Sequence, residues 1–266
     1  MKIHIFNTPE RLSEEAAKLI IRDINKKPNL VLGLSTGETP LKTYKKLIAA
    51  YENNKVDFSN VITFNLDEYI GLGKNDPNSY HYYMHQNFFD WINIKKDNIH
   101  LLDGLSKDYD KLSLKYDKLI NEYNGIDLQI LGIGINGHIG FNEPDTKLSI
   151  NTHVTTLSET TITQNNKYFS NKSKIPTHAI TMGLGNIMQA KKILLLATGK
   201  RKAHIMADFL KKSYVSTNTP ASALLLHQNL IIMMDKDAAK LYEKEMNSNE
   251  NNYKKYKNYH SQLNSR

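Results

Sequence analysis

The sequence predicts an α/β protein with a doubly wound, mostly parallel sheet and helices on both faces, a Rossmann-like arrangement. Short apolar runs alternate with longer amphipathic segments along the 266 residues. Several short runs are continuous stretches of Val, Ile and Leu, as expected of parallel strands that are covered on both faces. Strand–helix alternation over this length favours a single doubly wound sheet.

The first helix is expected after Thr8, because Thr is a good N-cap and Pro9 is tolerated at the first helical position. Other helical patterns are expected to start at Pro40 and to span Ser79–Phe89, Ser106–Tyr123 and Arg201–Lys211. The apolar runs predict eight strands, at Lys2–Phe6, Asn29–Leu34, Val61–Leu66, Asn98–Leu101, Leu128–Ile133, Ala179–Met182, Ile193–Ala197 and Leu230–Met234.

Two stretches depart from this alternation. Residues 145–178 are polar and rich in Thr, Asn, Ser and Lys, and we expect 151–178 to form a lid insertion that orders when a ligand binds. Residues 247–266 are rich in Asn, Lys and Tyr and are predicted to be a polar C-terminal tail. Nothing resembling a linker divides the rest, so we expect one α/β domain over residues 1–246.

The composition limits the classes of partner and site. The chain has no Cys, which excludes disulfides, thiolate zinc sites, Fe–S clusters and a Cys nucleophile, and which fits a cytoplasmic location. No run of about 18 apolar residues is present, so we expect no membrane span. The formal net charge of +8 suits an anionic small molecule. Without interleaved basic and aromatic residues, nucleic acid is not an expected partner.

The segment after the second predicted strand carries a candidate anion site. Gly37 permits a tight backbone turn, and Ser35, Thr36 and Thr39 bring hydroxyl and N–H groups to the start of a helix. Helix N-termini stabilise anions, phosphate especially. The alternative interpretation is an ordinary strand-to-helix loop with Thr as its N-cap.

The third predicted strand ends in two adjacent carboxylates, Asp67 and Glu68. Ligands of open α/β sheets bind outside the carboxyl ends of the strands. A partly buried carboxylate at such a place can transfer protons if burial raises its pKa. Since neighbouring side chains of an extended chain point in opposite directions, we expect only one of the two to face a pocket. The alternative is a solvated loop pair.

A glycine-rich loop follows the fifth predicted strand, over residues 132–144. Its G-x-G-x-x-G string does not indicate a dinucleotide site, because Gly140 and Pro144 prevent the helix that such a site requires. The loop presents Asn136, His138 and Glu143, and a carboxylate partner can orient a histidine and raise its basicity. The alternative, a capping histidine in a turn, is the weaker interpretation.

Three cations, Lys200, Arg201 and Lys202, follow another predicted strand at the start of a helix. Cations oppose the helix dipole at that end, so an anionic ligand is a plausible reason for them, and a solvated surface is the alternative. Gly199 and Lys200 are not part of a Walker loop, because Leu194 stands where the first Gly would be.

Two other kinds of active site are disfavoured. His81 and His85 have H-x-x-x-H spacing, but the residues between them lack the Glu of a metalloprotease helix, so no metal site is expected. No G-x-S-x-G string exists to present a serine nucleophile. The remaining features indicate acid–base chemistry on a phosphorylated small molecule.

Four strings together resemble those of the glucosamine-6-phosphate deaminase (glucosamine/galactosamine-6-phosphate isomerase) family, in order over about residues 1–240. Two of them are specific to it: Phe-Asn-Leu-Asp-Glu-Tyr at 64–69, and Gly-His-Ile-Gly-Phe-Asn-Glu-Pro at 137–144. The related 6-phosphogluconolactonases share the phosphate loop and a Gly-His but usually lack Phe-Asn-Glu-Pro. The other two strings are the loop at 33–40 and Gly-Lys-Arg-Lys-Ala at 199–203.

The resemblance implies that glucosamine 6-phosphate and water become fructose 6-phosphate and ammonia, without a metal or organic cofactor. Asp67 would carry a proton from C2 to C1. His138, supported by Glu143 and Asn136, would open the sugar ring. The expected phosphate-binding residues are Ser35, Thr36, Gly37, Thr39, Lys167 on the lid, and Lys202.

The sequence departs from some family members in three places. Asn136 stands where others have Asp, so it would orient His138 by hydrogen bonding and not by charge. Lys167 stands where some have Arg and offers a point charge instead of a bidentate fork. His153 and Thr155 stand where allosteric members have cations. We therefore expect no allosteric activation, and a monomer or small homo-oligomer.

Two alternative functions compete with that of a deaminase. A phosphogluconolactonase-like hydrolase of the same fold is disfavoured by the Phe-Asn-Glu-Pro string at 141–144. A non-catalytic sugar-phosphate sensor normally carries an N-terminal helix-turn-helix, and it would not need His138 or Asp67. We expect no such helix-turn-helix, because the first predicted strand begins at Lys2.

Overall fold

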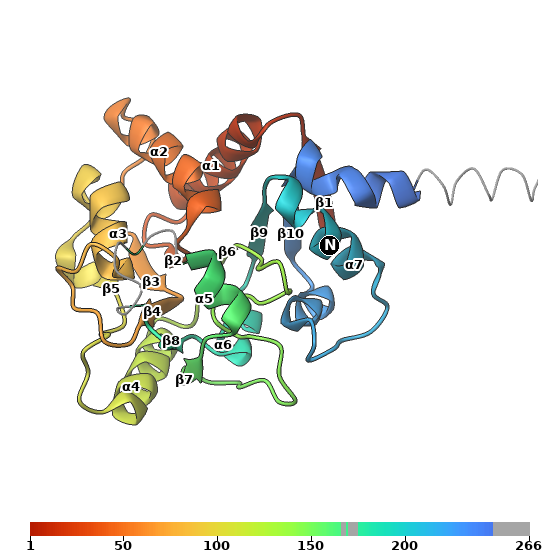
Figure 1. The fold of residues 1–266 in the computed structure, drawn as a ribbon. Coiled ribbons are helices and arrows are strands. Elements are labelled where there is room, and N and C mark those ends of the chain that lie inside the picture. The colour runs from red at the N-terminus through yellow and green to blue at the C-terminus, as the bar shows by residue number, and fades with distance from the viewer. Residues whose placement is uncertain (166–168, 170–174, 247–266) are drawn as a thin grey trace, which may run out of the picture.

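A computed structural model describes residues 1–165, 169 and 175–246 (Figure 1). Its main sheet has seven strands, all parallel, in the order β1-β10-β9-β6-β2-β3-β5. This confirms the predicted doubly wound α/β fold. The strands are β1 (Lys2–Phe6), β2 (Val31–Leu34), β3 (Ile62–Asn65), β5 (Ile99–His100), β6 (Leu128–Leu131), β9 (Ile193–Ala197) and β10 (Leu230–Asp235).

Helices cover both faces of this sheet, and neighbouring strand residues alternate between two cores. Val31 and Leu195 face a core with α4, α6, α7 and a helix at 236–246, whereas Leu32 and Leu194 face a core with α1, α2 and α3. Each fully buried aliphatic side chain contributes roughly 1.5–3 kcal/mol. The helices are α1 (Pro9–Lys26), α2 (Glu38–Glu52), α3 (Tyr80–Asn87), α4 (Tyr109–Glu122), α5 (Glu159–Asn165), α6 (Leu184–Met188) and α7 (Ala203–Lys211).

The predicted start of α1 is confirmed. Helix α2 begins at Glu38, two residues before the predicted start at Pro40. The Thr8 hydroxyl accepts a hydrogen bond from Arg11 N at 3.2 Å, and Pro9 is the first helical residue. The early start of α2 follows from Gly37, which turns the chain with a φ of 98°. Pro40 fits inside the first turn, where its missing N–H costs no intrahelical bond.

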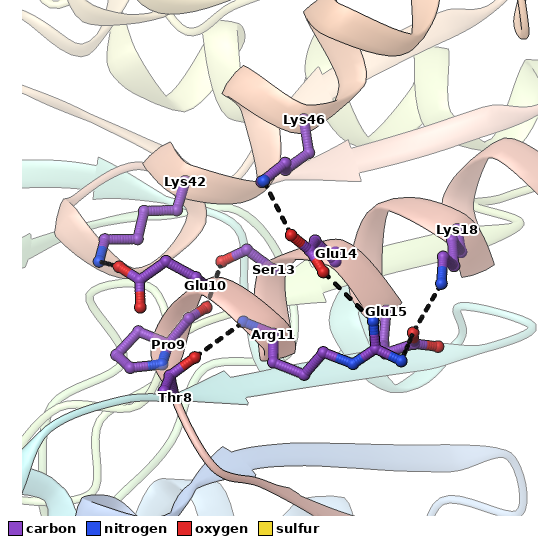
Figure 2. A network of polar contacts seen from close by, with 10 residues as sticks. All are labelled: Thr8, Pro9, Glu10, Arg11, Ser13, Glu14, Glu15, Lys18, Lys42 and Lys46. Atoms are coloured by element: carbon purple, nitrogen blue, oxygen red, sulfur yellow. Dashed lines mark hydrogen bonds and ion pairs between the residues drawn. The ribbon is translucent and has the colours of Figure 1, made fainter.

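Charged side chains join α1 to α2 on the outer surface, as Figure 2 shows. Lys42 of α2 pairs with Glu10, and Lys46 of α2 pairs with Glu14 at 3.0 Å. Exposed ion pairs contribute roughly 0–1 kcal/mol each. These pairs help to hold α2 against α1, and the predicted anion loop lies at the N-terminus of α2. Helix α1 also holds its own i,i+3 and i,i+4 pairs, which are Arg11–Glu14, Arg11–Glu15 and Lys18–Glu15.

A second, smaller sheet lies beside the first and has three antiparallel strands in the order β4-β8-β7 (Figure 1). Strand β8 (His178–Thr181) matches the strand expected at 179–182, but it pairs with β4 (Asp67–Tyr69) and β7 (His153–Thr156) and not within the main sheet. Neither partner was predicted. Strands β4 and β7 have only three and four residues of mixed polarity, too few to show the alternation of polar and apolar residues that marks a strand.

Leu66 joins the two sheets. Its N–H donates to Leu34 O of β2 at 3.0 Å, and its own carbonyl accepts from Met182 N, just after β8, at 2.7 Å. The chain thus leaves β3 and enters β4 through a single residue. The position of Asp67 is fixed by both sheets.

The polar segment 151–178 is partly built into this small sheet. Residues 153–156 pair with β8, and the hydroxyl of Thr152 donates to Asp117 of α4 at 2.5 Å. The side chain of Asn186 donates to the same carboxylate at 2.6 Å. The expected lid therefore begins on an anchored strand. Its candidate ligand Lys167 and the predicted tail 247–266 lie outside the described residues.

None of the described helices combines the length and the apolar character that crossing a lipid bilayer would require.

Candidate active site

A cavity of about 1000 Å³ opens at the carboxyl edge of the main sheet. The loops that follow β2, β3, β6 and β9 line it, as the rule for open α/β sheets predicts. The four sequence segments selected as functional, which are far apart along the chain, therefore meet at one place.

The loop between β2 and α2 forms one side of the cavity, and all four of its predicted ligands, Ser35, Thr36, Gly37 and Thr39, line it. The hydroxyl of Tyr83 donates to Gly37 O at 2.6 Å and fixes the turn. Ser35 Oγ is buried and has no hydrogen-bond partner among the described residues. Together with the N-terminal turn of α2, whose N–H groups point toward this end of the helix, the loop is suited to bind an anion.

The cationic segment Lys200–Lys202, a 3₁₀ turn that opens α7, lies beside this loop and lines the same cavity. The hydroxyls of Thr39 and Thr198 are 3.4 Å apart, which brings the two loops into contact. Burial, and then the charge of Arg201, lower the pKa of Lys202 to about 8. An anion bound here would stabilise the protonated form of Lys202 and raise this pKa again, so the arrangement favours the ligand-binding interpretation over a solvated surface.

Asp67 lies deeper in the cavity and is 7% exposed. Burial, with a contribution from the neighbouring Glu68, raises the pKa of Asp67 to about 8. Glu68 points to the other side of β4 and does not line the cavity, as strand geometry predicts. Both carboxylates are buried, so the alternative of a solvated loop pair is wrong.

His138 lines the cavity from the loop after β6, with Glu143 and Asn136 behind it. Its Nδ1 lies 3.3 Å from Glu143 Oε2, and Asn136 Nδ2 donates to the same oxygen at 2.7 Å. Burial alone would raise the pKa of Glu143, but the neighbouring imidazole of His138, with the donors Thr161 and Asn136, lowers it to about 2. Glu143 is therefore ionised at neutral pH and can orient the imidazole.

The loop needs glycine at position 134. A β-carbon there would lie 2.4 Å from ring atoms of His138, so the imidazole can occupy its place only over a bare backbone. Residues 132–158 contain no helix, which agrees with the exclusion of a dinucleotide site.

Several residues of the site were not predicted. The hydroxyl of Thr161, on α5, donates to Glu143. Four aromatic side chains pack together beside Asp67, and all line the cavity: Tyr69, Tyr80, Phe141 and Phe169. The aromatic character of 80–89 was visible in the sequence, but nothing distinguished Thr161 from the other threonines around it. Among the described residues, no group of three or more His, Asp or Glu side chains could hold a metal ion.

An anion site beside two proton-transfer groups is suited to an enzyme that acts on a phosphorylated small molecule. The chain belongs to the family described as glucosamine-6-phosphate isomerases/6-phosphogluconolactonase, whose model matches residues 7–233. It is 52% identical to a glucosamine-6-phosphate deaminase of Thermoanaerobacter sp. (strain X514), over 91% of this chain and 95% of the relative. It is 51% identical to that of Clostridium novyi (strain NT), over 90% and 99%.

Solved structures agree with this membership. A monomeric glucosamine-6-phosphate deaminase, 43% identical, superimposes with a TM-score of 0.88 over 91% of this chain and 100% of its own. The 6-phosphogluconolactonase of Trypanosoma brucei has a TM-score of 0.71 at 21% identity, over 90% of this chain and 97% of its own. The second likeness shows a shared fold only.

Proposed function

We propose that this protein is a glucosamine-6-phosphate deaminase, which converts glucosamine 6-phosphate and water to fructose 6-phosphate and ammonia. The observation that carries the proposal is that Asp67 and the His138–Glu143 pair share one cavity with an anion site. Ring opening and the transfer of a proton between two carbons need two separate acid–base groups. Deaminases of about 50% identity over nine-tenths of the chain support the same reaction.

The substrate phosphate binds in the cavity between the loop that joins β2 to α2 and the cationic segment Lys200–Lys202. Ser35, Thr36, Gly37 and Thr39 supply hydroxyl and N–H donors, and Lys202 supplies charge. Lys167, from the part of the chain outside the described residues, remains a proposed further contact.

His138 opens the sugar ring. Its imidazole takes the proton from the hydroxyl at C1 and a proton is returned to the ring oxygen, so that the C1–O5 bond breaks and an aldehyde forms. Glu143 stabilises the imidazolium during this transfer, and Asn136 holds the Glu143 carboxylate in place.

Asp67 then moves a proton along the open chain. The aldehyde at C1 makes the proton at C2 acidic, and the Asp67 carboxylate removes it to give an enol-type intermediate. The same group returns the proton to C1, while the amino group loses one proton and the C1 oxygen gains one, so that a hydroxymethyl group at C1 and an imine at C2 result. Water then hydrolyses the imine to the ketone and ammonia. A carboxylate whose pKa is raised to about 8 is a stronger base than an ordinary aspartate and can also return the proton.

We place the reaction in the cytoplasm, in the degradation of N-acetylglucosamine, with residues 1–246 as one catalytic domain, 151–178 as its lid and a monomer or small homo-oligomer in solution. The absence of Cys and the likeness to a monomeric deaminase support these assignments.

One assay tests the function against its alternatives. The purified protein is incubated with glucosamine 6-phosphate, and ammonia and fructose 6-phosphate are measured; we expect both in equal amounts. Hydrolysis of 6-phosphogluconolactone without ammonia release would indicate the lactonase instead. Binding of the phosphosugar without any turnover would indicate a sensor.

A further inference from the structure

Glu68 is buried next to the proposed active site, yet it has no part in the mechanism above. It is 2% exposed and does not line the cavity. Its carboxylate accepts three backbone hydrogen bonds: Oε1 from Tyr69 N at 2.8 Å and Tyr80 N at 2.9 Å, and Oε2 from His81 N at 2.8 Å. Burying a carboxylate is costly, so its presence here needs a reason.

Two of these donors belong to the first turn of α3. Glu68 therefore satisfies N–H groups that a helix N-terminus leaves free and holds that end of α3 against β4. Helix α3 in turn carries Tyr80, whose ring stacks on Phe141 with centroids 6.0 Å apart, and Tyr83, whose hydroxyl binds Gly37 O. One side chain thus fixes the aromatic wall and, through Tyr83, the anion loop.

Glu68 also places a negative charge directly behind Asp67. The groups that face Asp67 from the helices packed around it are the phenols of Tyr44 on α2, Tyr80 on α3 and Tyr116 on α4, which are neutral at ordinary pH. Among the described residues, the charge that acts on the pKa of Asp67 is that of Glu68. Glu68 in turn faces the exposed Asp103.

We propose that Glu68 is a positioning residue that couples the first turn of α3 to Asp67: it fixes the wall of the cavity and keeps Asp67 basic by its negative charge. The inference rests on the proposed function only for the role of Asp67 as the proton carrier. An aspartate that ionised fully in weak acid would be a poor base for a carbon-bound proton. Burial raises the pKa of Glu68 to about 7, and the three N–H donors hold it below the pKa of about 8 of Asp67. Glu68 is therefore largely ionised where Asp67 titrates, since hydrogen bonds to a carboxylate favour its charged form.

The test compares Glu68→Gln, Glu68→Asp and the control Asp103→Asn. Gln keeps the size of the side chain, and its carbonyl can replace Oε1 and accept two of the three hydrogen bonds, but it carries no charge. Asp keeps the charge and is too short to hold all three donors. Asp103→Asn also removes one negative charge, but it leaves every contact of Glu68 intact.

The measurement is kcat/KM for glucosamine 6-phosphate against pH. We expect the acid limb of Glu68→Gln to move to lower pH by about one unit, because a like charge has been removed. Glu68→Asp should lower kcat/KM about tenfold without moving that limb, and Asp103→Asn should leave kcat/KM close to wild type and shift the limb by less than Glu68→Gln does. An unmoved limb in Glu68→Gln, or a drop in rate alone in both Glu68 variants, would overturn the proposal.

A second readout keeps the inference separate from the reaction. The Asp67 carboxyl carbon is titrated by NMR in wild type and Glu68→Gln, with the signal assigned by its loss in Asp67→Asn. We expect its midpoint to fall by about one unit in Glu68→Gln. If the wild-type protein did not turn over glucosamine 6-phosphate, the proposed function would be wrong, but this titration would still test the role of Glu68. An unchanged midpoint for Asp67 in Glu68→Gln would show that Glu68 does not have that role.

Discussion

Asp67 and Glu143 are two carboxylates of one active-site region with almost the same burial, 7% and 8% exposed, and opposite pKa shifts. Burial raises the pKa of Asp67 to about 8. The pKa of Glu143 is lowered to about 2, although burial acts on it in the same direction. Side-chain donors reach Glu143 from Asn136 and Thr161, and His138 adds its charge, whereas no hydrogen bond within the described part of the chain reaches the carboxylate of Asp67.

The comparison shows that burial alone does not decide what a carboxylate can do. A group that must exchange a proton needs a site where its charged form is unstable, and a group that must stay charged needs donors. The two environments therefore assign Asp67 to carbon proton transfer and Glu143 to the support of His138.

The largest effect is expected from Asp67→Asn. Loss of the proton carrier should lower kcat by about 10²–10⁴ with little change in KM, because the phosphate contacts remain. Initial rates with glucosamine 6-phosphate give both constants. Asp237→Asn, at another carboxylate that lines the cavity, is the control and should keep its activity. Full turnover in Asp67→Asn would remove Asp67 from the mechanism.

The same substitution should stabilise the fold at alkaline pH. Because the pKa of Asp67 is raised in the folded state, wild type is destabilised as pH rises from about 4 to about 8, and Asn removes this cost. We expect a gain on the order of a few kcal/mol in the free energy of unfolding at pH 8, and almost none at pH 4. Denaturant unfolding at the two pH values measures it. Equal differences at both would show that Asp67 ionises normally.

Glu143→Gln should change stability with the opposite dependence on pH. A carboxylate of lowered pKa stabilises the fold above its unfolded value of about 4.5, and this contribution is lost as pH falls toward 2. We expect the variant to be less stable by on the order of 2–3 kcal/mol at pH 7, with a gap that narrows below pH 4.5. If both variants shifted stability in the same direction at pH 7, the contrast between the two carboxylates would be false.

The smallest effect concerns Lys202, a half-buried ionisable group that lines the same cavity. Lys202→Ala should raise KM by about tenfold and change kcat less, since a phosphate contact is made in both the ground and the transition state. Steady-state kinetics with the phosphorylated substrate measure this. Arg201→Ala, at the exposed neighbour that pairs with Glu38 at 3.5 Å, is the matched control and should raise KM less. An unchanged KM in Lys202→Ala would place the phosphate elsewhere.

The strands of the main sheet and the four segments that form the site could be predicted from the sequence. Continuous apolar runs mark strands such as β9 and β10, and glycine and proline limit the loops after them. The small sheet was not predicted, because β4 and β7 are short and of mixed polarity, and β4 pairs with a strand more than a hundred residues away, which no local pattern indicates. The opposite pKa shifts of Asp67 and Glu143 could not be predicted, because they depend on which donors the fold brings to each carboxylate: His138, Thr161 and Asn136 surround Glu143, and burial dominates at Asp67.

The length of the chain at Leu66 decides which side chain meets the substrate. Leu66 is bonded to both sheets, and side chains alternate along the strand that follows it. One residue inserted after Leu66 would itself face the cavity, and it would turn Asp67 toward α3, where Glu68 now lies. The length of the connection between the two sheets thus determines which side chain faces the cavity. We expect a change of one residue in this length to damage catalysis as much as the loss of Asp67 itself.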